Sequence, residues 1–113
     1  MGRVEEKKKI EEIDIEELRP SKEEIKLKVI LYAKRFKPLR ELLIWIWKHR
    51  YDSITSDDLM ADFGIKRELA LYKLNYLANL GILEKFGSKP KVFRVFDEKM
   101  LEEIVKELGG MEE

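Results

Sequence analysis

The segment from Asp57 to Leu83 limits the folds open to this chain more than any other part of its sequence. Apolar residues recur there every three or four positions, as the buried side of an α-helix requires. Gly64 and Gly81 interrupt the pattern, and glycine ends helices readily because it adopts the left-handed backbone conformation without steric cost. The segment therefore predicts a short helix, a tight turn and a longer helix over about residues 66–80.

A small β-hairpin is predicted directly after the second glycine. Leu83–Phe86 and Lys91–Phe96 are rich in strand-forming residues, and Gly87–Pro90 between them has turn composition. Ser53–Thr55, upstream of the first helix of the pair, is a candidate for one further, very short strand.

Two more helices are predicted before this region. Ser21 and Glu24 form the S-x-x-E capping box of a first helix, which is favoured over the strand that local alternation also permits. Pro38 suits the first turn of a second helix. The expected apolar stripes are Ile25, Val29, Tyr32 and Phe36 in the first helix, and Leu39, Leu42, Leu43 and Ile46 in the second. Trp45 and Trp47 lie outside this second stripe, so they are buried within the chain or in a dimer interface, the former being favoured by base rates for tryptophan.

The last predicted helix follows Asp97, a candidate N-cap, and Gly109 ends it. The helix is amphipathic, and its apolar side packs either on its own domain or on a second copy of the chain. As a dimer interface it would use Leu101, Ile104, Val105 and Leu108.

The order of these features resembles the winged helix–turn–helix family, here of a small archaeal type. The family pattern of apolar and glycine positions is met in register by Leu59, Phe63, Gly64, Ile65, Ala70, Leu74, Leu77, Gly81, Ile82 and Leu83, and the wing hairpin follows. The resemblance covers roughly residues 38–96. It implies a mainly α fold with a small β-hairpin, a winged helix–turn–helix with additional N-terminal and C-terminal helices. The expected organisation is a flexible charged arm (1–20), the winged-helix domain with its N-terminal helix (21–96), and a C-terminal helix and tail (97–113).

For function, the resemblance implies a homodimeric regulator of transcription that binds double-stranded DNA. The helix at 66–80 would enter the major groove, and the wing at 84–96 would contact the backbone. On the side opposite Ala70, Asn75 can pair with adenine and Glu68 can accept from cytosine. The full set of expected DNA contacts is Lys66, Arg67, Glu68, Leu71, Tyr72, Lys73, Asn75, Tyr76, Lys85, Lys89, Lys91 and Arg94.

A protein-binding role for the same helix is the alternative. The family commonly has small polar residues on the helix surface where this chain has Leu69 and Leu71, and Tyr72 and Tyr76 add aromatic surface. A leucine side chain has no hydrogen-bonding group with which to distinguish bases, so it contacts only a thymine methyl group or another apolar surface. The helix is therefore a candidate for protein interaction or assembly as well as for DNA.

Charge is unevenly distributed although the net charge is zero. Residues 21–96 carry 16 basic and 9 acidic side chains, a net charge of +7, between acidic ends. A basic middle suits an anionic partner such as nucleic acid, and it equally suits ion pairing with the two ends.

The chain has few of the cysteine and histidine residues that catalysis or metal binding commonly uses. There is no cysteine, and His49 is the single histidine, placed where a surface or helix-capping role is expected. Asp57 and Asp58 are expected to stabilise a helix N-terminus. We therefore expect a protein that is not an enzyme, with no catalytic residue, metal or cofactor.

The sequence also carries expectations about compartment and source. The start of the chain lacks the apolar segment of a secretory signal, and the longest apolar run, Leu42–Trp47, is too short to cross a bilayer. A cytoplasmic protein without membrane contact is expected. Abundant Glu, Lys and Ile, with no glutamine and two asparagines, are typical of a thermophile.

Overall fold

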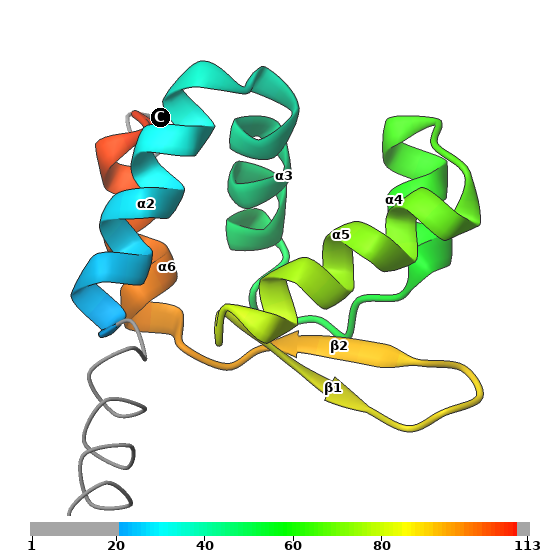
Figure 1. Ribbon diagram of the computed structural model, residues 1–113. Coiled ribbons are helices and arrows are strands. Elements are labelled where there is room, and N and C mark those ends of the chain that lie inside the picture. Colours follow the sequence, from blue (N-terminus) through cyan, green and yellow to red (C-terminus); the bar gives the residue numbers. More distant parts are fainter. Residues whose placement is uncertain (1–20, 111–113) are drawn as a thin grey trace, which may run out of the picture.

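Five helices and one two-stranded antiparallel sheet make up the part of the chain that the computed structural model describes, residues 21–110 (Figure 1). The elements are α2 (Lys22–Arg35), α3 (Lys37–Lys48), α4 (Ser56–Phe63), α5 (Arg67–Asn79), β1 (Leu83–Phe86), β2 (Val92–Val95) and α6 (Glu98–Glu107). The predicted mainly α fold with a small hairpin is confirmed. The predicted arm at 1–20 and residues 111–113 of the tail lie outside the described residues.

Side-chain caps start three of the helices at the residues that the sequence predicts. Ser21 Oγ accepts a hydrogen bond from the Glu24 backbone N–H at 3.2 Å. Asp58 Oδ2 accepts from the backbone N–H of Thr55 at 2.9 Å, and Asp97 Oδ1 accepts from that of Met100 at 3.0 Å. These bonds satisfy backbone groups that helix ends leave unpaired, so local sequence determines where α2, α4 and α6 begin.

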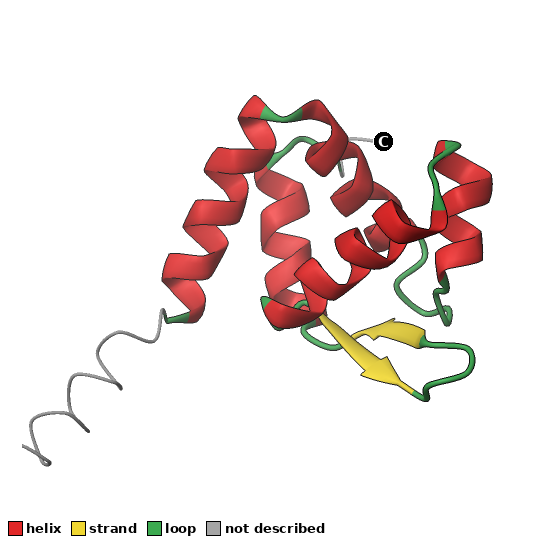
Figure 2. Cartoon of the chain, turned by 45° about the vertical axis from the view of Figure 1, so that its right-hand side comes forward, coloured by secondary structure: helices red, strands yellow, loops and turns green. Residues whose placement is uncertain are grey.

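The helices form two groups joined through the hairpin. α2, α3 and α6 pack on one another, whereas α4 packs on α5 and the hairpin lies along α5 (Figures 1 and 2). Ile54 and Phe93 exchange two backbone hydrogen bonds of 2.7 Å, which confirms the very short strand as a single bridge. Because both side chains are buried, this bridge ties the α3–α4 connection to the core and to β2.

The core-facing side of α2 differs from the predicted stripe. Val29, Ile30 and Ala33 are buried, whereas Tyr32 and Phe36 are 46% and 50% exposed. The prediction that these two aromatic residues belong to the core is wrong. The physical reason is that α2 packs against both α3 and α6, and the small Ala33 allows that close approach, which rotates the helix away from the aromatic side.

The predicted dimer helix belongs to the core of its own chain. Leu101, Ile104 and Val105 of α6 are fully buried against α2 and α3, and Leu108 is half-buried. Packing on the same domain, the alternative left open by the sequence, is therefore observed, and these side chains do not form an exposed surface for a second copy. Trp47 is likewise buried within the chain, which its aromatic character favoured.

Candidate nucleic-acid interface and the groove beside it

Helix α5 is the element around which the candidate site is built. Ala70, Leu74 and Leu77 are fully buried, as predicted, so its other residues face outward or to the two sides. Gly64, whose φ of 64° is left-handed, ends α4 and lets the chain turn into α5. The two helices thereby form the predicted helix–turn–helix, with the outward side of α5 free of any other described element.

The flank of α5 toward the hairpin carries one group of the expected DNA contacts. Arg67 and Leu71 line a shallow pocket of about 360 Å³ together with Lys89 and Lys91 at the tip of the hairpin. Ser56, the first residue of α4, completes this side of the pocket. Arg67 is 3.2 Å from Asp57, while Lys66, Lys89 and Lys91 form no ion pair with any residue of the described range. The result is a positive surface shared by α5 and the hairpin tip.

The expected clamp of four wing charges is divided by the pairing of the strands. Lys85 lies opposite Phe93, whereas Arg94 lies opposite Glu84. Since neighbouring residues of a strand point to opposite faces of the sheet, Lys85 and Arg94 lie on opposite faces of the hairpin. Glu84 also offsets the charge of Arg94. Lys89 and Lys91 lie in the turn between the strands and are the two wing cations that line the pocket beside α5.

The residues of α5 that are expected to contact DNA bases differ in their exposure. Glu68 and Tyr72 are exposed, but Asn75 is half-buried. Leu69, 45% exposed, faces away from the hairpin side and lines a different pocket. Glu68 and Tyr72 are therefore better placed than Asn75 to meet a partner.

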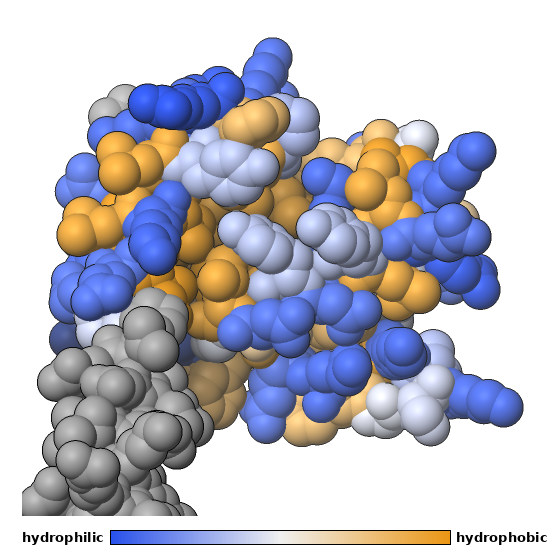
Figure 3. All heavy atoms as spheres, in the orientation of Figure 1, coloured by the Kyte–Doolittle hydropathy of each residue, from blue (hydrophilic) through white to orange (hydrophobic). Residues whose placement is uncertain are grey.

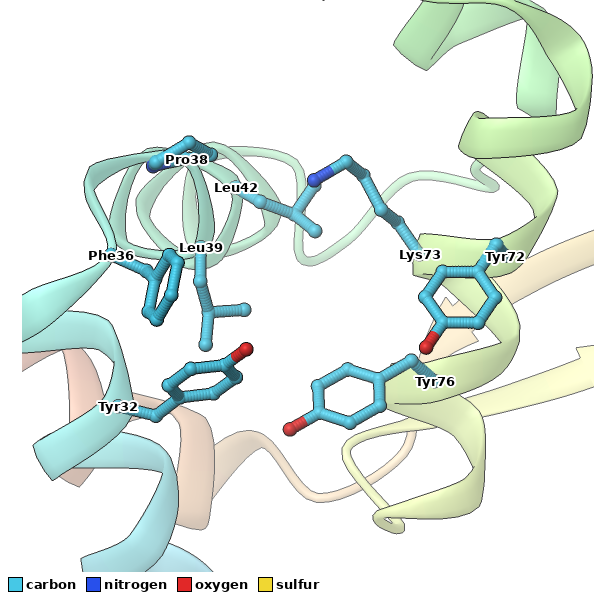
Figure 4. A pocket seen from close by; sticks show the side chains of 8 residues that line it. All are labelled: Tyr32, Phe36, Pro38, Leu39, Leu42, Tyr72, Lys73 and Tyr76. Atoms are coloured by element: carbon cyan, nitrogen blue, oxygen red, sulfur yellow. The ribbon is translucent and has the colours of Figure 1, made fainter.

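The opposite flank of α5 faces α2 and α3 across an apolar groove. One part of it, about 190 Å³, we call the tyrosine groove (Figure 4). It is lined by Tyr32, Phe36, Pro38, Leu39, Leu42, Tyr72, Lys73 and Tyr76. An adjoining pocket of about 370 Å³ shares Pro38, Leu42 and Lys73 and continues toward the α4–α5 turn. Tyr72, Lys73 and Tyr76, expected on the DNA surface, thus lie on the side of α5 away from Arg67 and the hairpin tip.

The apolar spacing of α2 does not predict this groove, because it places Tyr32 and Phe36 in the core. The usable signal was on α5, where Leu69, Lys73 and Tyr76 recur at helical spacing outside the core stripe. Figure 3 shows apolar surface over α2 and mainly hydrophilic surface over the hairpin. α5 lies between these two environments.

Burial raises the pKa of the Tyr76 hydroxyl, and the neighbouring hydroxyls of Tyr32 and Tyr72 raise it further. The ordinary pKa of tyrosine is about 10, so Tyr76 stays protonated at neutral pH and retains a hydrogen-bond donor. Within residues 21–110, no side-chain or backbone group hydrogen-bonds to these three hydroxyls.

Ion pairs connect the acidic C-terminal segment to the basic middle of the chain. Lys22 lies 3.2 Å from Asp97, Lys26 lies 2.7 Å from Glu103, and Arg50 lies 3.6 Å from Glu98. Pairing between an acidic end and the middle, one of the two explanations for the charge pattern, is therefore observed for the C-terminal end. It involves basic residues on the side of α2 and α3 and leaves those of the hairpin tip unpaired within the described range.

His49 occupies the predicted C-terminal capping position of α3, where its backbone N–H lies 3.1 Å from the Trp45 carbonyl oxygen. Its ring packs on Trp45, and Nδ1 lies 3.3 Å from Oδ2 of Asp52, three residues along the chain. No group of three metal-binding side chains occurs in the described part of the chain. None of its helices is long and apolar enough to cross a membrane.

Comparison with protein-family models finds no match, and comparison with curated proteins finds no significant relative. The functional conclusions below therefore depend on the geometry and chemistry of this chain.

Proposed function

We propose that this chain is a winged-helix protein that binds double-stranded DNA and regulates transcription. In this proposal α5 enters the major groove, which is about as wide as a helix with its side chains. The hairpin tip contacts the phosphate backbone. The observation that carries the proposal is the grouping of Arg67, on the second helix of the helix–turn–helix, with Lys89 and Lys91 of the hairpin tip beside it.

Each part of this surface has a distinct role in the proposal. Lys89 and Lys91 position the protein through phosphates, since backbone contacts give affinity without reading sequence. Glu68, exposed in the first turn of α5, accepts a hydrogen bond from the amino group of cytosine. The regulator acts as a homodimer, because two symmetric copies suit a palindromic site.

A salt-dependent titration tests the proposal. Fluorescence anisotropy of a labelled mixed-sequence duplex is measured with increasing protein at several salt concentrations. The Lys89→Ala, Lys91→Ala double variant should bind more weakly and lower the slope of log K against log salt by up to about two, because each cation releases about one counterion.

The matched control is Lys99→Ala with Lys106→Ala, which removes two exposed cations from α6, outside α5 and the hairpin. This control should leave the salt slope unchanged. Absence of binding to the duplex at low salt, or an equal change in both double variants, would remove the proposal.

A protein-interaction role for α5 is the second candidate, favoured by the exposure of Leu69 and Tyr72. Leu71 is half-buried on the hairpin side, so Leu69 replaces it in this candidate surface. Tyr72→Ala with Leu69→Ala should then abolish capture of a partner in a pull-down and change DNA affinity little. A loss of DNA affinity without loss of a captured partner would exclude this role.

A further inference from the structure

The tyrosine groove combines an apolar floor with polar atoms around its opening. Leu39 and Leu42 of α3 form the floor and are buried, while the aromatic rings form the walls. In Figure 4 the hydroxyls of Tyr32 and Tyr76 point toward each other across the groove, and the Tyr72 hydroxyl points toward Tyr76. Two helix groups, α2–α3 and α5, thus contribute hydrogen-bonding groups to one opening.

The polar atoms of this opening are matched to an anion. Lys73 carries a positive charge and only donates hydrogen bonds, and each tyrosine hydroxyl has a donor to offer. None of the eight residues that line the tyrosine groove is acidic. Glu41 lines the adjoining pocket and lies 3.8 Å from Lys37, and no described carboxylate forms an ion pair with Lys73. An acidic ligand group would therefore find uncompensated donors and positive charge.

The dimensions of the groove suit a small molecule. The tyrosine groove has a volume of 190 Å³, and the pocket beside it has 370 Å³. Together the two volumes fall in the usual range of ligand pockets, about 300–1,000 Å³. Aromatic rings pair favourably with other rings in offset or edge-to-face arrangements. Tyr32 and Phe36, whose ring centroids lie 4.6 Å apart edge to face, form one wall and Tyr76 the other, so a flat apolar body would pair with rings on both sides.

We propose that the tyrosine groove binds a small organic anion, with its flat apolar body on Leu42 and between the aromatic side chains. Its acidic group accepts hydrogen bonds from the tyrosine hydroxyls, and the Lys73 ammonium, which in Figure 4 lies toward Pro38 and Leu42, reaches it by rotation of its flexible side chain. The site goes beyond the proposed DNA function, because none of its contacts involves nucleic acid. It uses the flank of α5 opposite the flank assigned to the hairpin tip.

Two fluorescent probes with the same ring system test the inference in the absence of DNA. 1-Anilinonaphthalene-8-sulfonate carries an anionic group, and N-phenyl-1-naphthylamine lacks it. Both are titrated into the full chain, and fluorescence reports transfer into an apolar site. The sulfonate probe should bind more tightly, and Lys73→Met should weaken its binding by about tenfold, the effect of losing one hydrogen bond to a charged group. Binding of the neutral probe should be unchanged.

Lys85→Met is the matched control, because it removes the same charge from an exposed position on β1, outside the groove. It should leave both probes unaffected. Tyr32→Phe and Tyr76→Phe delete only a hydroxyl. Each should weaken the binding of the sulfonate probe and leave the binding of the neutral probe unchanged. They keep the inference testable if Lys73→Met reduces the cooperativity of thermal unfolding.

Three results would overturn the inference. Equal affinity for the two probes would show that the groove recognises apolar surface alone. Equal weakening by Lys73→Met and Lys85→Met would show attraction to overall charge. Absence of saturable binding to a folded chain would show that the groove takes no small ligand. Because DNA is absent from each titration, these outcomes are independent of the DNA proposal.

Discussion

Single residues determine the helix–turn–helix through backbone conformation. Gly64 has a left-handed φ of 64°, and a Cβ placed there would meet no atom within 4 Å. A larger residue at this position therefore suffers from backbone strain and not from collision. The sequence identified Gly64 correctly because this requirement is local.

Gly64→Ala should lower the free energy of unfolding by about 1–2 kcal/mol, the cost of a left-handed conformation for a residue with a Cβ. Urea denaturation followed by circular dichroism measures it. Gly64→Asn should lose less, because asparagine tolerates this conformation better. Equal stability of Gly64→Ala and the native chain would contradict the strain at this residue.

The capping carboxylate of Asp97 links stability to pH. Its hydrogen bond from Met100, and secondly the ammonium of Lys22, lower the pKa of Asp97 below its ordinary value. A lowered pKa in the folded state stabilises the fold above the ordinary value of about 4, and this stabilisation is lost as pH falls through the folded-state pKa.

Asp97→Asn retains a capping side chain but has no titrating group. Urea denaturation between pH 7 and pH 3 should show the native chain losing stability more steeply than this variant below about pH 4. The free energies of unfolding of the native chain and of Asp97→Asn should approach each other as the pH falls. Parallel pH profiles would show that Asp97 has the same pKa in the folded and unfolded chain.

At the scale of elements, α6 is part of the core although its sequence suits a dimer interface equally well. An amphipathic helix has an apolar side, but its own periodicity does not specify which surface covers that side. In the structure the covering surface is provided by α2 and α3. Removing 97–113, which leaves a monomer in the dimer interpretation, should instead prevent folding.

Ile104→Ala should lower the free energy of unfolding by about 2–5 kcal/mol, because it leaves a cavity in a core that is fully buried. Lys106→Ala on the exposed side of α6 should stay within about 0.5 kcal/mol. Urea denaturation compares the two. A near-neutral Ile104→Ala with a changed molecular mass would place α6 at an interface.

For the whole molecule, the described part of the chain leaves an apolar strip of α2 exposed. Leu27 and Leu31, one helical turn apart, are 57% and 64% exposed. The first turn of α2 is acidic and the last turn is basic. Two copies of α2 packed antiparallel would therefore bring leucine to leucine and opposite charges together at both ends. We expect the proposed homodimer to use this surface in place of α6.

Leu31→Glu should convert a dimer to a monomer by placing a charge in the apolar strip, as measured by light scattering across micromolar protein concentrations. Phe96→Glu is the control, because Phe96 is 63% exposed and lies outside α2 and α5, and it should keep the native mass. An unchanged mass for Leu31→Glu would exclude α2 as the interface.

Much of the fold could be predicted, but only part of the candidate site. Arg67, Lys89 and Lys91 were named from the sequence and lie together. The sequence predicts that Tyr72, Lys73 and Tyr76 belong to the same DNA-contacting surface, but these residues line the tyrosine groove. Helical periodicity places them outside the core, and the position of α2 decides what they face.

Local interactions account for the parts of the fold that can be predicted without knowing the packing. The spacing of apolar residues, the capping side chains and Gly64 specify the helices, the turn and the hairpin, because each acts within a few residues. Which side of α2 is buried, what covers α6 and how the two flanks of α5 differ become clear only when the elements are packed together. These outcomes depend on packing between distant segments, where several apolar surfaces compete for the same partners.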